Sequence, residues 1–188
     1  MIITMVTGNC HKVDEAVSFF SDVARIEHVS MDLPEIRHED VRCVAYEKAR
    51  AAWERLHRPV IVDDTGFFIN ALNGFPGTCA AYCMKTIGNA GILRLMEGVK
   101  DRSAYFQTVI AYATDDGIRV FSGRIDGLVL EMPVGTGGFG YDPIFSFEGR
   151  SLAEIPLSEK SVVSHRGRAL AGFRDWFISK KPSEYNND

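Results

Sequence analysis

The pattern of hydrophobic and polar positions at the start of the chain predicts a strand, a turn and a helix. Residues 2–6 are mostly apolar, as in a short buried strand, and a polar segment containing Gly8 follows them. A second short strand is expected at residues 26–29. The helix between the two strands is indicated by apolar residues at helical spacing, which are Val13, Ala16, Val17 and Phe20.

Helical periodicity recurs at three other places. A long helix is predicted from Asp40, a suitable N-cap, to about Leu56. Two short helices are expected at residues 79–86 and 89–96, separated at Gly88. The last helix is predicted to begin near Ser164 as its N-cap. The inner side of the long helix is expected to carry Val41, Val44, Ala45, Ala49, Ala52 and Leu56.

A run of β-branched residues at 60–62 predicts a buried strand in the middle of the chain. We expect this strand to end by delivering Asp63 and Asp64 to a turn that contains Gly66. Residues 67–69 would then continue as a strand or a sheet edge.

The clearest hairpin spans residues 104–113 and 118–124, joined by turn-forming residues at 115–117. It is expected to extend the sheet and to shape a second lobe. The alternation of strands and helices before it predicts an α/β fold.

Composition adds bounds to this picture. The 188 residues are 46% hydrophobic and suit one folded domain over residues 1–188, or a domain built of two lobes, with a polar tail from about residue 181. The longest apolar runs are far shorter than a membrane span and no signal peptide is recognised, so we expect a cytoplasmic protein with no membrane partner. The formal net charge of −4 argues against a protein that coats nucleic acid.

The four cysteines form no CxxC pair, so a zinc site is not predicted.

The first turn, from Thr7 to Lys12, is a candidate anion site. Backbone N–H groups at the start of a helix bind anions, and Lys12 in the first helical turn adds a positive charge. The sequence is not a Walker A loop, and a plain strand-to-helix turn is an equally good interpretation of this segment alone.

The adjacent pair Asp63 and Asp64 is a candidate metal and water site. Two carboxylates at the end of an apolar strand cost free energy unless a cation or a protonation equilibrium uses them. Two other charged residues are ambiguous by themselves. A glutamate such as Glu35 is more often a solvated surface residue than a metal ligand. Lys48 is either a surface lysine that extends its stem along apolar neighbours or a lysine that reaches into the site.

Residues 135–140 match GxGxxG by letter, but a dinucleotide site requires a helix directly after the glycines. Pro143 disfavours a helix there, so we predict a glycine-rich loop that presents Phe139, Tyr141 and Asp142 inward. His165 and Arg166 are expected at the start of the last helix, where cations oppose the helix dipole, which favours a ligand-binding role.

Four separated segments together closely resemble the inosine triphosphate pyrophosphatase family. They are TGNCHK from Thr7, DDTG with NGFPG from Asp63, GGFGYDP from Gly137 and SHRGRAL from Ser164. The resemblance runs from about Thr7 to Leu170. It implies hydrolysis of ITP, dITP and XTP to the monophosphate and pyrophosphate with Mg²⁺. It also implies an elongated two-lobed α/β fold with a long central mixed sheet flanked by helices, a cleft between the lobes, and a homodimer.

The resemblance assigns roles to individual residues. It implies that Asp64 is the catalytic proton acceptor and binds the metal together with Glu35. Lys48 and Thr65 match further substrate contacts. The positions that match the triphosphate turn are Thr7, Gly8, Asn9 and Lys12, and those that match the nucleoside site are Phe139, Gly140, Tyr141, Asp142, Lys160, His165 and Arg166.

Elementary chemistry agrees with these roles. Mg²⁺ prefers one or two carboxylates with waters and phosphate oxygens, which Glu35 and Asp64 would complement while Asp64 activates a water for attack on the α-phosphorus. Arg166 would donate to the 6-oxo group of a deaminated purine, and Phe139 would stack on the ring. Asp63 is expected to orient the turn or to repel a wrongly placed phosphate.

The chain also departs from the family's pattern. Some relatives carry a basic residue at the position of Ala81, and whether Lys85 replaces it is left open. Cys10 and His11 are assigned no role. Two alternatives to the main prediction remain, namely a Maf-like pyrophosphatase acting on other modified nucleotides and a nucleotide sensor without hydrolysis.

Overall fold

The computed structural model describes residues 2–180, so the tail expected from about residue 181 lies outside the described residues. Asn9 caps the first helix and Asp40 the second, each through a side-chain oxygen that accepts from a backbone N–H two residues on. In chain order the elements are β1 (Ile2–Val6), α1 (Cys10–Phe20), β2 (Arg25–Val29), α2 (Val41–Leu56), β3 (Val60–Ile69), β4 (Pro76–Gly77), α3 (Ala80–Thr86), α4 (Gly88–Leu95), β5 (Ser103–Thr114), β6 (Gly117–Val129), β7 (Phe145–Phe147), β8 (Arg150–Ser151), α5 (Leu157–Val163) and α6 (His165–Ser179).

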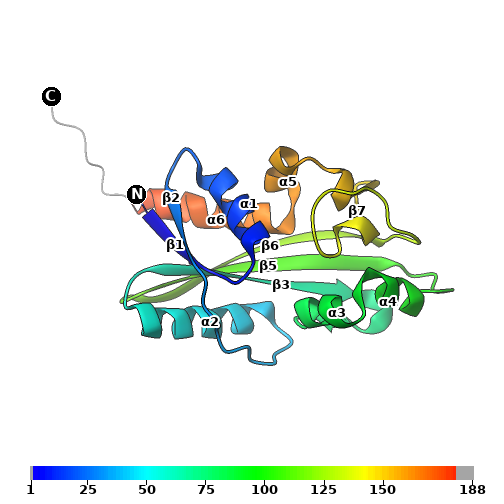
Figure 1. Cartoon of the computed structure of the whole chain (residues 1–188), viewed down its shortest axis with the longest axis horizontal. Coiled ribbons are helices and arrows are strands. Elements are labelled where there is room, and N and C mark those ends of the chain that lie inside the picture. The colour runs from blue at the N-terminus through cyan, green and yellow to red at the C-terminus, as the bar shows by residue number, and fades with distance from the viewer. Residues whose placement is uncertain (1, 181–188) are drawn as a thin grey trace.

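The strands of residues 2–180 form one mixed, eight-stranded sheet, which confirms the α/β prediction. Its order is β2-β1-β3-β5-β6-β7-β8, and β4 pairs with β3. β1 is parallel to both β2 and β3, and the other pairings are antiparallel. Figure 1 shows β3, β5 and β6 running along the long axis, with α1, α5 and α6 on one side of the sheet and α2, α3 and α4 on the other.

The two faces of β3 pack against different helices because successive side chains of a strand point to opposite faces. Val60 and Val62 pack in the core cluster that includes Ala45, Ala49 and the other small residues of α2. Ile61 belongs to the cluster with Phe20 of α1 and Phe173 of α6. The helices thereby fix which groups meet each face of β3.

The expected end of the central strand at Asp63 and Asp64 is wrong. β3 continues to Ile69 and pairs with β5 along its whole length, with Asp63 opposite Ile110 and Asp64 opposite Val109. Adjacent residues on a strand face opposite ways, so the two carboxylates are separated by the sheet. Asp63 therefore has no turn to orient.

Gly66 is also part of this strand rather than of a turn. A Cβ at Gly66 would lie 2.4 Å from the ring of Phe68, so glycine makes room for that ring.

The other edge of β3 has an interruption at the acidic residues. β1 pairs with β3 only as far as Val62, and β4 pairs with Phe67 and Phe68. Within the described residues, positions 63–66 have a strand neighbour on the β5 side alone.

The remaining differences concern the second half of the chain. The hairpin is longer than predicted, because Ser103 pairs with Leu128 and the strands meet in a two-residue loop between Thr114 and Gly117. Helix α5 was not predicted, since its seven residues are too few for a clear periodic pattern. No helix within residues 2–180 is long and apolar enough to cross a membrane.

Gly123 of β6 lies where the start of α6 crosses the sheet. A Cβ there would stand 2.1 Å from the carbonyl oxygen of His165 and 2.5 Å from the nitrogen of Ala169. Because both neighbours are backbone atoms, glycine permits the close approach that places His165 and Arg166 over the sheet.

We predict that Gly123→Ala lowers the free energy of unfolding by about 1–3 kcal/mol, because α6 must move away from the sheet. Urea denaturation measures the change. Gly172→Ala on α6 is the control, since its Cβ would contact Phe121 at an ordinary 3.9 Å. That variant should be neutral or more stable by up to about 1 kcal/mol. Wild-type stability of Gly123→Ala would refute the close-approach argument.

Candidate active site

Asp63 is a buried carboxylate between two cations on the α1 and α6 side of the sheet. Lys12 Nζ lies 2.5 Å from Asp63 Oδ1 and donates a 3.0 Å hydrogen bond to the Asp63 backbone carbonyl. Arg166 Nε donates to Asp63 Oδ2 at 2.7 Å. Burial alone would raise the pKa of Asp63, but Arg166 and Lys12 outweigh it and hold the pKa far below its ordinary value.

The ion pairs continue from Arg166 into the second half of the chain. Arg166 Nη1 donates to Glu15 Oε2 at 2.6 Å, and Lys160 Nζ lies 3.3 Å from Glu15 Oε1. Lys160 Nζ also donates to Asp142 Oδ2 at 2.6 Å. The network contains three carboxylates and three cations, which neutralise one another. All of its members except Lys12 are buried, namely Glu15, Asp63, Asp142, Lys160 and Arg166.

On the opposite face of β3, Asp64 meets a different cation. Lys48 Nζ of α2 lies 3.0 Å from Asp64 Oδ2 and donates to Glu35 Oε1 at 2.9 Å. Asp64 Oδ1 accepts a 2.9 Å hydrogen bond from the backbone N–H of Thr65. Burial lowers the pKa of Lys48, but the two carboxylates outweigh burial and the pKa is raised.

The donor set around Lys48 fits a divalent cation. Glu35 and Asp64 already converge on one positive charge, and Asp64 Oδ2 is buried without a hydrogen bond of good geometry. Residues 2–180 contain no cluster of three or more His, Cys, Asp or Glu side chains arranged for a metal. Mg²⁺ commonly takes one or two carboxylates and completes its shell with waters and phosphate oxygens, so the pair suits a metal that arrives with a phosphate ligand.

The turn before α1 is ordered by its own side chains. Thr7 Oγ1 accepts from the N–H of Asn9 at 3.1 Å, and Asn9 Oδ1 accepts from the N–H of His11 at 3.0 Å. Gly8 is exposed, and a Cβ there would meet nothing within 4 Å. The backbone at Gly8 is therefore open to an anion, whereas the Lys12 ammonium is directed at Asp63.

His165 sits among buried hydroxyl groups and packs on an aromatic ring. Its Nδ1 lies 2.6 Å from Thr108 Oγ1, which lies 2.6 Å from Thr65 Oγ1. The ring stacks on Phe106 at 4.8 Å between centroids. Burial, with the positive charges of Arg166 and Lys160, lowers the pKa of His165 well below its ordinary value, so the imidazole is neutral at pH 7.

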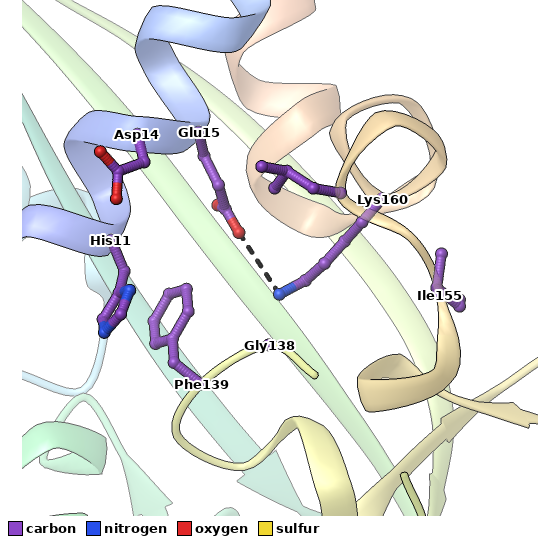
Figure 2. A pocket seen from close by; sticks show the side chains of 8 residues that line it. His11, Asp14, Glu15, Gly138, Phe139, Ile155 and Lys160 are labelled. Carbon is purple, nitrogen blue, oxygen red and sulfur yellow. Dashed lines mark ion pairs between the residues drawn. The ribbon is translucent and has the colours of Figure 1, made fainter. Parts of the chain in front are cut away.

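The glycine-rich loop closes one side of a cavity of about 200 Å³. Figure 2 shows the lining side chains that come from α1, from the loop and from α5. Asp142 Oδ2 accepts from the N–H of Phe139 at 2.7 Å and thereby fixes the loop. The cavity is lined by His11, Asp14, Glu15, Gly138, Phe139, Ile155, Leu157 and Lys160.

Two other residues of this segment are held away from the cavity. The Tyr141 hydroxyl is buried and donates to the Ala80 carbonyl at 2.9 Å. The Gly140 carbonyl accepts from Asn89 Nδ2 at 3.0 Å. Tyr141 therefore supports the loop from the core side instead of facing the cavity lining.

The structure brings the predicted site residues together in two groups joined at β3. Lys12, Asp142, Lys160 and Arg166 lie on the α6 face, and Glu35, Lys48 and Asp64 lie on the α2 face. Thr65 connects to the first group, because Arg166 Nη2 donates to its hydroxyl at 3.3 Å.

Glu15 and His11 were not predicted. Glu15 could have been found from its spacing, since it follows Lys12 by three residues and shares its helix face. Its burial against Lys160 and Arg166 was not predictable, because a glutamate in a helix is ordinarily solvated. Ala81 and Lys85 are both exposed on α3.

Comparison with known proteins identifies the family. A sequence profile of the Ham1 family matches residues 3–176, and this chain belongs to that family. It is 44% identical over 179 residues to a dITP/XTP pyrophosphatase of Thermococcus kodakarensis, covering 94% of this chain and 97% of that protein. A dITP/XTP pyrophosphatase of Methanopyrus kandleri is 44% identical over 181 residues, covering 94% and 96%.

Solved structures agree with this assignment. The Ham1 protein of Staphylococcus aureus superposes with a TM-score of 0.83 at 26% identity, covering 96% of this chain and 100% of that chain. A HAM1 protein from Coxiella burnetii gives a TM-score of 0.83 at 30% identity, covering 95% and 99%. The family resemblance drawn from the four sequence segments is confirmed.

We predict that acid lowers the stability of the protein through His165. The folded state keeps this imidazole neutral, whereas the unfolded chain takes up a proton below about pH 6.5. The unfolded state then binds more protons, so the free energy of unfolding decreases as the pH is lowered, by up to about 1.4 kcal/mol per pH unit for one group.

Urea denaturation between pH 7.5 and 5.5 measures this slope. His165→Gln should flatten it, because the remaining histidines, His11, His28, His38 and His57, are exposed. Equal slopes in the variant and the wild type would exclude His165 as the titrating group.

Proposed function

We propose that this protein hydrolyses the deaminated purine nucleoside triphosphates ITP, dITP and XTP to the monophosphate and pyrophosphate. The observation that carries the proposal is the 44% identity, over 94% of the chain, to proteins named dITP/XTP pyrophosphatase. The arrangement of cations on both faces of β3 supports it, because a triphosphate requires several positive groups and a metal site close together.

The phosphate end of the substrate is assigned to β3, α2 and the first turn. Thr7, Gly8, Asn9 and Lys12 form the triphosphate turn, supported by the open backbone at Gly8 and the helix start beyond it. Lys48 exchanges its contacts with the two carboxylates for contacts with phosphate oxygens, and the Thr65 hydroxyl adds a further contact.

The metal is assigned to Glu35 and Asp64. Mg²⁺, when bound, neutralises phosphate charge and polarises the α-phosphorus and a water. Asp64 accepts the proton of the water that attacks the α-phosphorus, and pyrophosphate leaves as one piece. Its neighbour Asp63 is a poorer base for this step, because Lys12 and Arg166 lower its pKa and occupy both of its carboxylate oxygens.

The base is assigned to the cavity beside the glycine-rich loop. Phe139 stacks on the purine, and Lys160 and Arg166 supply donors for its 6-oxo acceptor, since both lie near the Phe139 ring. Adenine presents an amino group at that position, and an unpaired donor costs about 1–3 kcal/mol, or a factor of roughly ten to a hundred.

Four other residues of the predicted nucleoside site contribute through position. Asp142 holds both the Phe139 N–H and the Lys160 ammonium. Gly140, Tyr141 and His165 support the same loop and the start of α6 from behind.

The proposal includes the larger organisation of the molecule. The chain acts as a single domain of two lobes that share β3, β5 and β6, with the substrate cleft where the loop at residues 135–140 meets α1. The cavity lined from both sides supports that location. The enzyme works as a homodimer, as the family resemblance implies.

A product assay tests the reaction. Purified protein is incubated with ITP, dITP, XTP, GTP, ATP and dUTP, with and without Mg²⁺, and products are separated by ion-exchange chromatography. We expect monophosphate and pyrophosphate from the first three, only with the metal present. Orthophosphate with a nucleoside diphosphate would rule out attack on the α-phosphorus, and a preference for dUTP would rule out the purine assignment.

We predict that the same substitution lowers turnover at Asp64 and stability at its neighbour Asp63. Asp64→Asn should reduce kcat by at least about 100-fold, the usual contribution of a general base, and leave stability nearly unchanged. It should also weaken Mn²⁺ binding measured by electron paramagnetic resonance.

Asp63→Asn is the matched control, because it removes the buried carboxylate charge that Lys12 and Arg166 share. It should destabilise the fold by about 3–5 kcal/mol in urea denaturation. Near-normal turnover by Asp64→Asn would place the general base elsewhere.

A further inference from the structure

Phe139, the ring assigned to the base, is in contact with an aromatic residue of the phosphate turn. The His11 imidazole stacks on it with 5.1 Å between ring centroids and 12° between the ring planes. Lys160 Nζ lies 4.9 Å from the centroid of the Phe139 ring. Figure 2 shows the Phe139 ring between the His11 imidazole and the Lys160 ammonium.

The backbone around Phe139 does little to orient the ring. Gly138 and Gly140 flank it, both with positive φ, of 69° and 64°, so neither neighbour carries a side chain that could support it. The N–H of Phe139 is fixed by Asp142 Oδ2, which holds the Cα but leaves the side-chain torsions free. The orientation of the ring therefore depends on what packs against its faces.

His11 is suited to that task by its position. It lies in the first turn of α1, where its N–H donates to Asn9 Oδ1, so its backbone is as fixed as the helix start. Its side chain is exposed and takes no part in the ion pairs of Glu15, Lys160 and Arg166. The stack with Phe139 thus joins the phosphate turn to the glycine-rich loop.

We infer that His11 is a positioning residue for base recognition in the reaction proposed above. It supports one face of Phe139, so that the face on the side of Lys160 and Arg166 is presented to the purine. A base, Phe139 and His11 then form a three-layer stack. The same helix turn that receives the phosphates thereby sets the plane against which the base packs.

The size of the expected effect follows from the free energy of an aromatic pair, which corresponds to roughly a two- to tenfold change in binding. Because His11 acts through Phe139 and contacts neither the phosphorus nor the water, its loss should appear in KM and leave kcat near the wild-type value. This inference rests on the proposed function, so its test must distinguish the two.

The experiment compares His11→Ala, His11→Phe and the control Ser18→Ala, an exposed residue one to two turns further along α1. KM and kcat are measured with XTP and dITP, and inhibition by inorganic tripolyphosphate is measured in parallel. We expect a two- to tenfold higher KM for His11→Ala, restoration by His11→Phe, and wild-type values for Ser18→Ala. Tripolyphosphate has no base, so its inhibition constant should be the same in all variants.

Three results would overturn the inference. An unchanged KM in His11→Ala would remove the role, and a lower KM would mean that His11 competes with the purine for Phe139. A weaker inhibition by tripolyphosphate would make His11 a phosphate contact. If the wild-type protein fails to hydrolyse XTP and dITP, the proposed function fails, and calorimetric affinities of the same variants for IMP still test His11 alone.

Discussion

Two charged residues that are adjacent on a buried strand point to opposite faces of the sheet, and each requires its own counter-charge. In β3 this constraint separates Asp63 from Asp64. The buried Asp63 meets Lys12 and Arg166, whereas Asp64 meets Lys48, which it shares with the exposed Glu35. The environment of each carboxylate suits it to a different task, one holding the fold together and the other free to exchange its cation.

The buried ion pairs also determine how distant segments are arranged. Glu15, Asp63, Asp142, Lys160 and Arg166 come from five separate elements or loops, and each charge is shared with another. Removing one partner leaves a buried charge uncompensated, which costs far more than an exposed ion pair contributes. On the α6 face the residues proposed to bind the nucleoside are therefore largely those that also hold the fold together, and substitutions there are expected to lower stability.

Local patterns were sufficient to predict β1 from its apolar run and α1, α2 and α6 from apolar residues at helical spacing, with Asp40 and Ser164 marking the starts of α2 and α6. The continuation of β3 was not predictable, because Asp63 and Asp64 have low strand propensity and only pairing with β5 keeps them extended. The types of the site residues were recognisable from their segments.

Their partners were not recognisable in the same way. That Arg166 contacts Glu15 across 151 positions of sequence depends on the crossing of α6 and α1 over the sheet. The stack of His11 on Phe139 likewise joins the first turn of α1 to the glycine-rich loop, and no periodic pattern relates these two segments.

The interruption in the pairing of β3 bears on the separation of Asp63 and Asp64 by the sheet. A continuous sheet separates the groups on its two faces, so those groups cannot contact the same small molecule. Between Val62 and Phe67 the β3 backbone has no strand partner on the β1 side within residues 2–180, because β1 has ended and β4 has not begun. At this stretch of β3 the Lys12 ammonium lies on one face and the Lys48 ammonium on the other, so cations from opposite sides of the sheet flank a backbone edge that no strand of residues 2–180 covers.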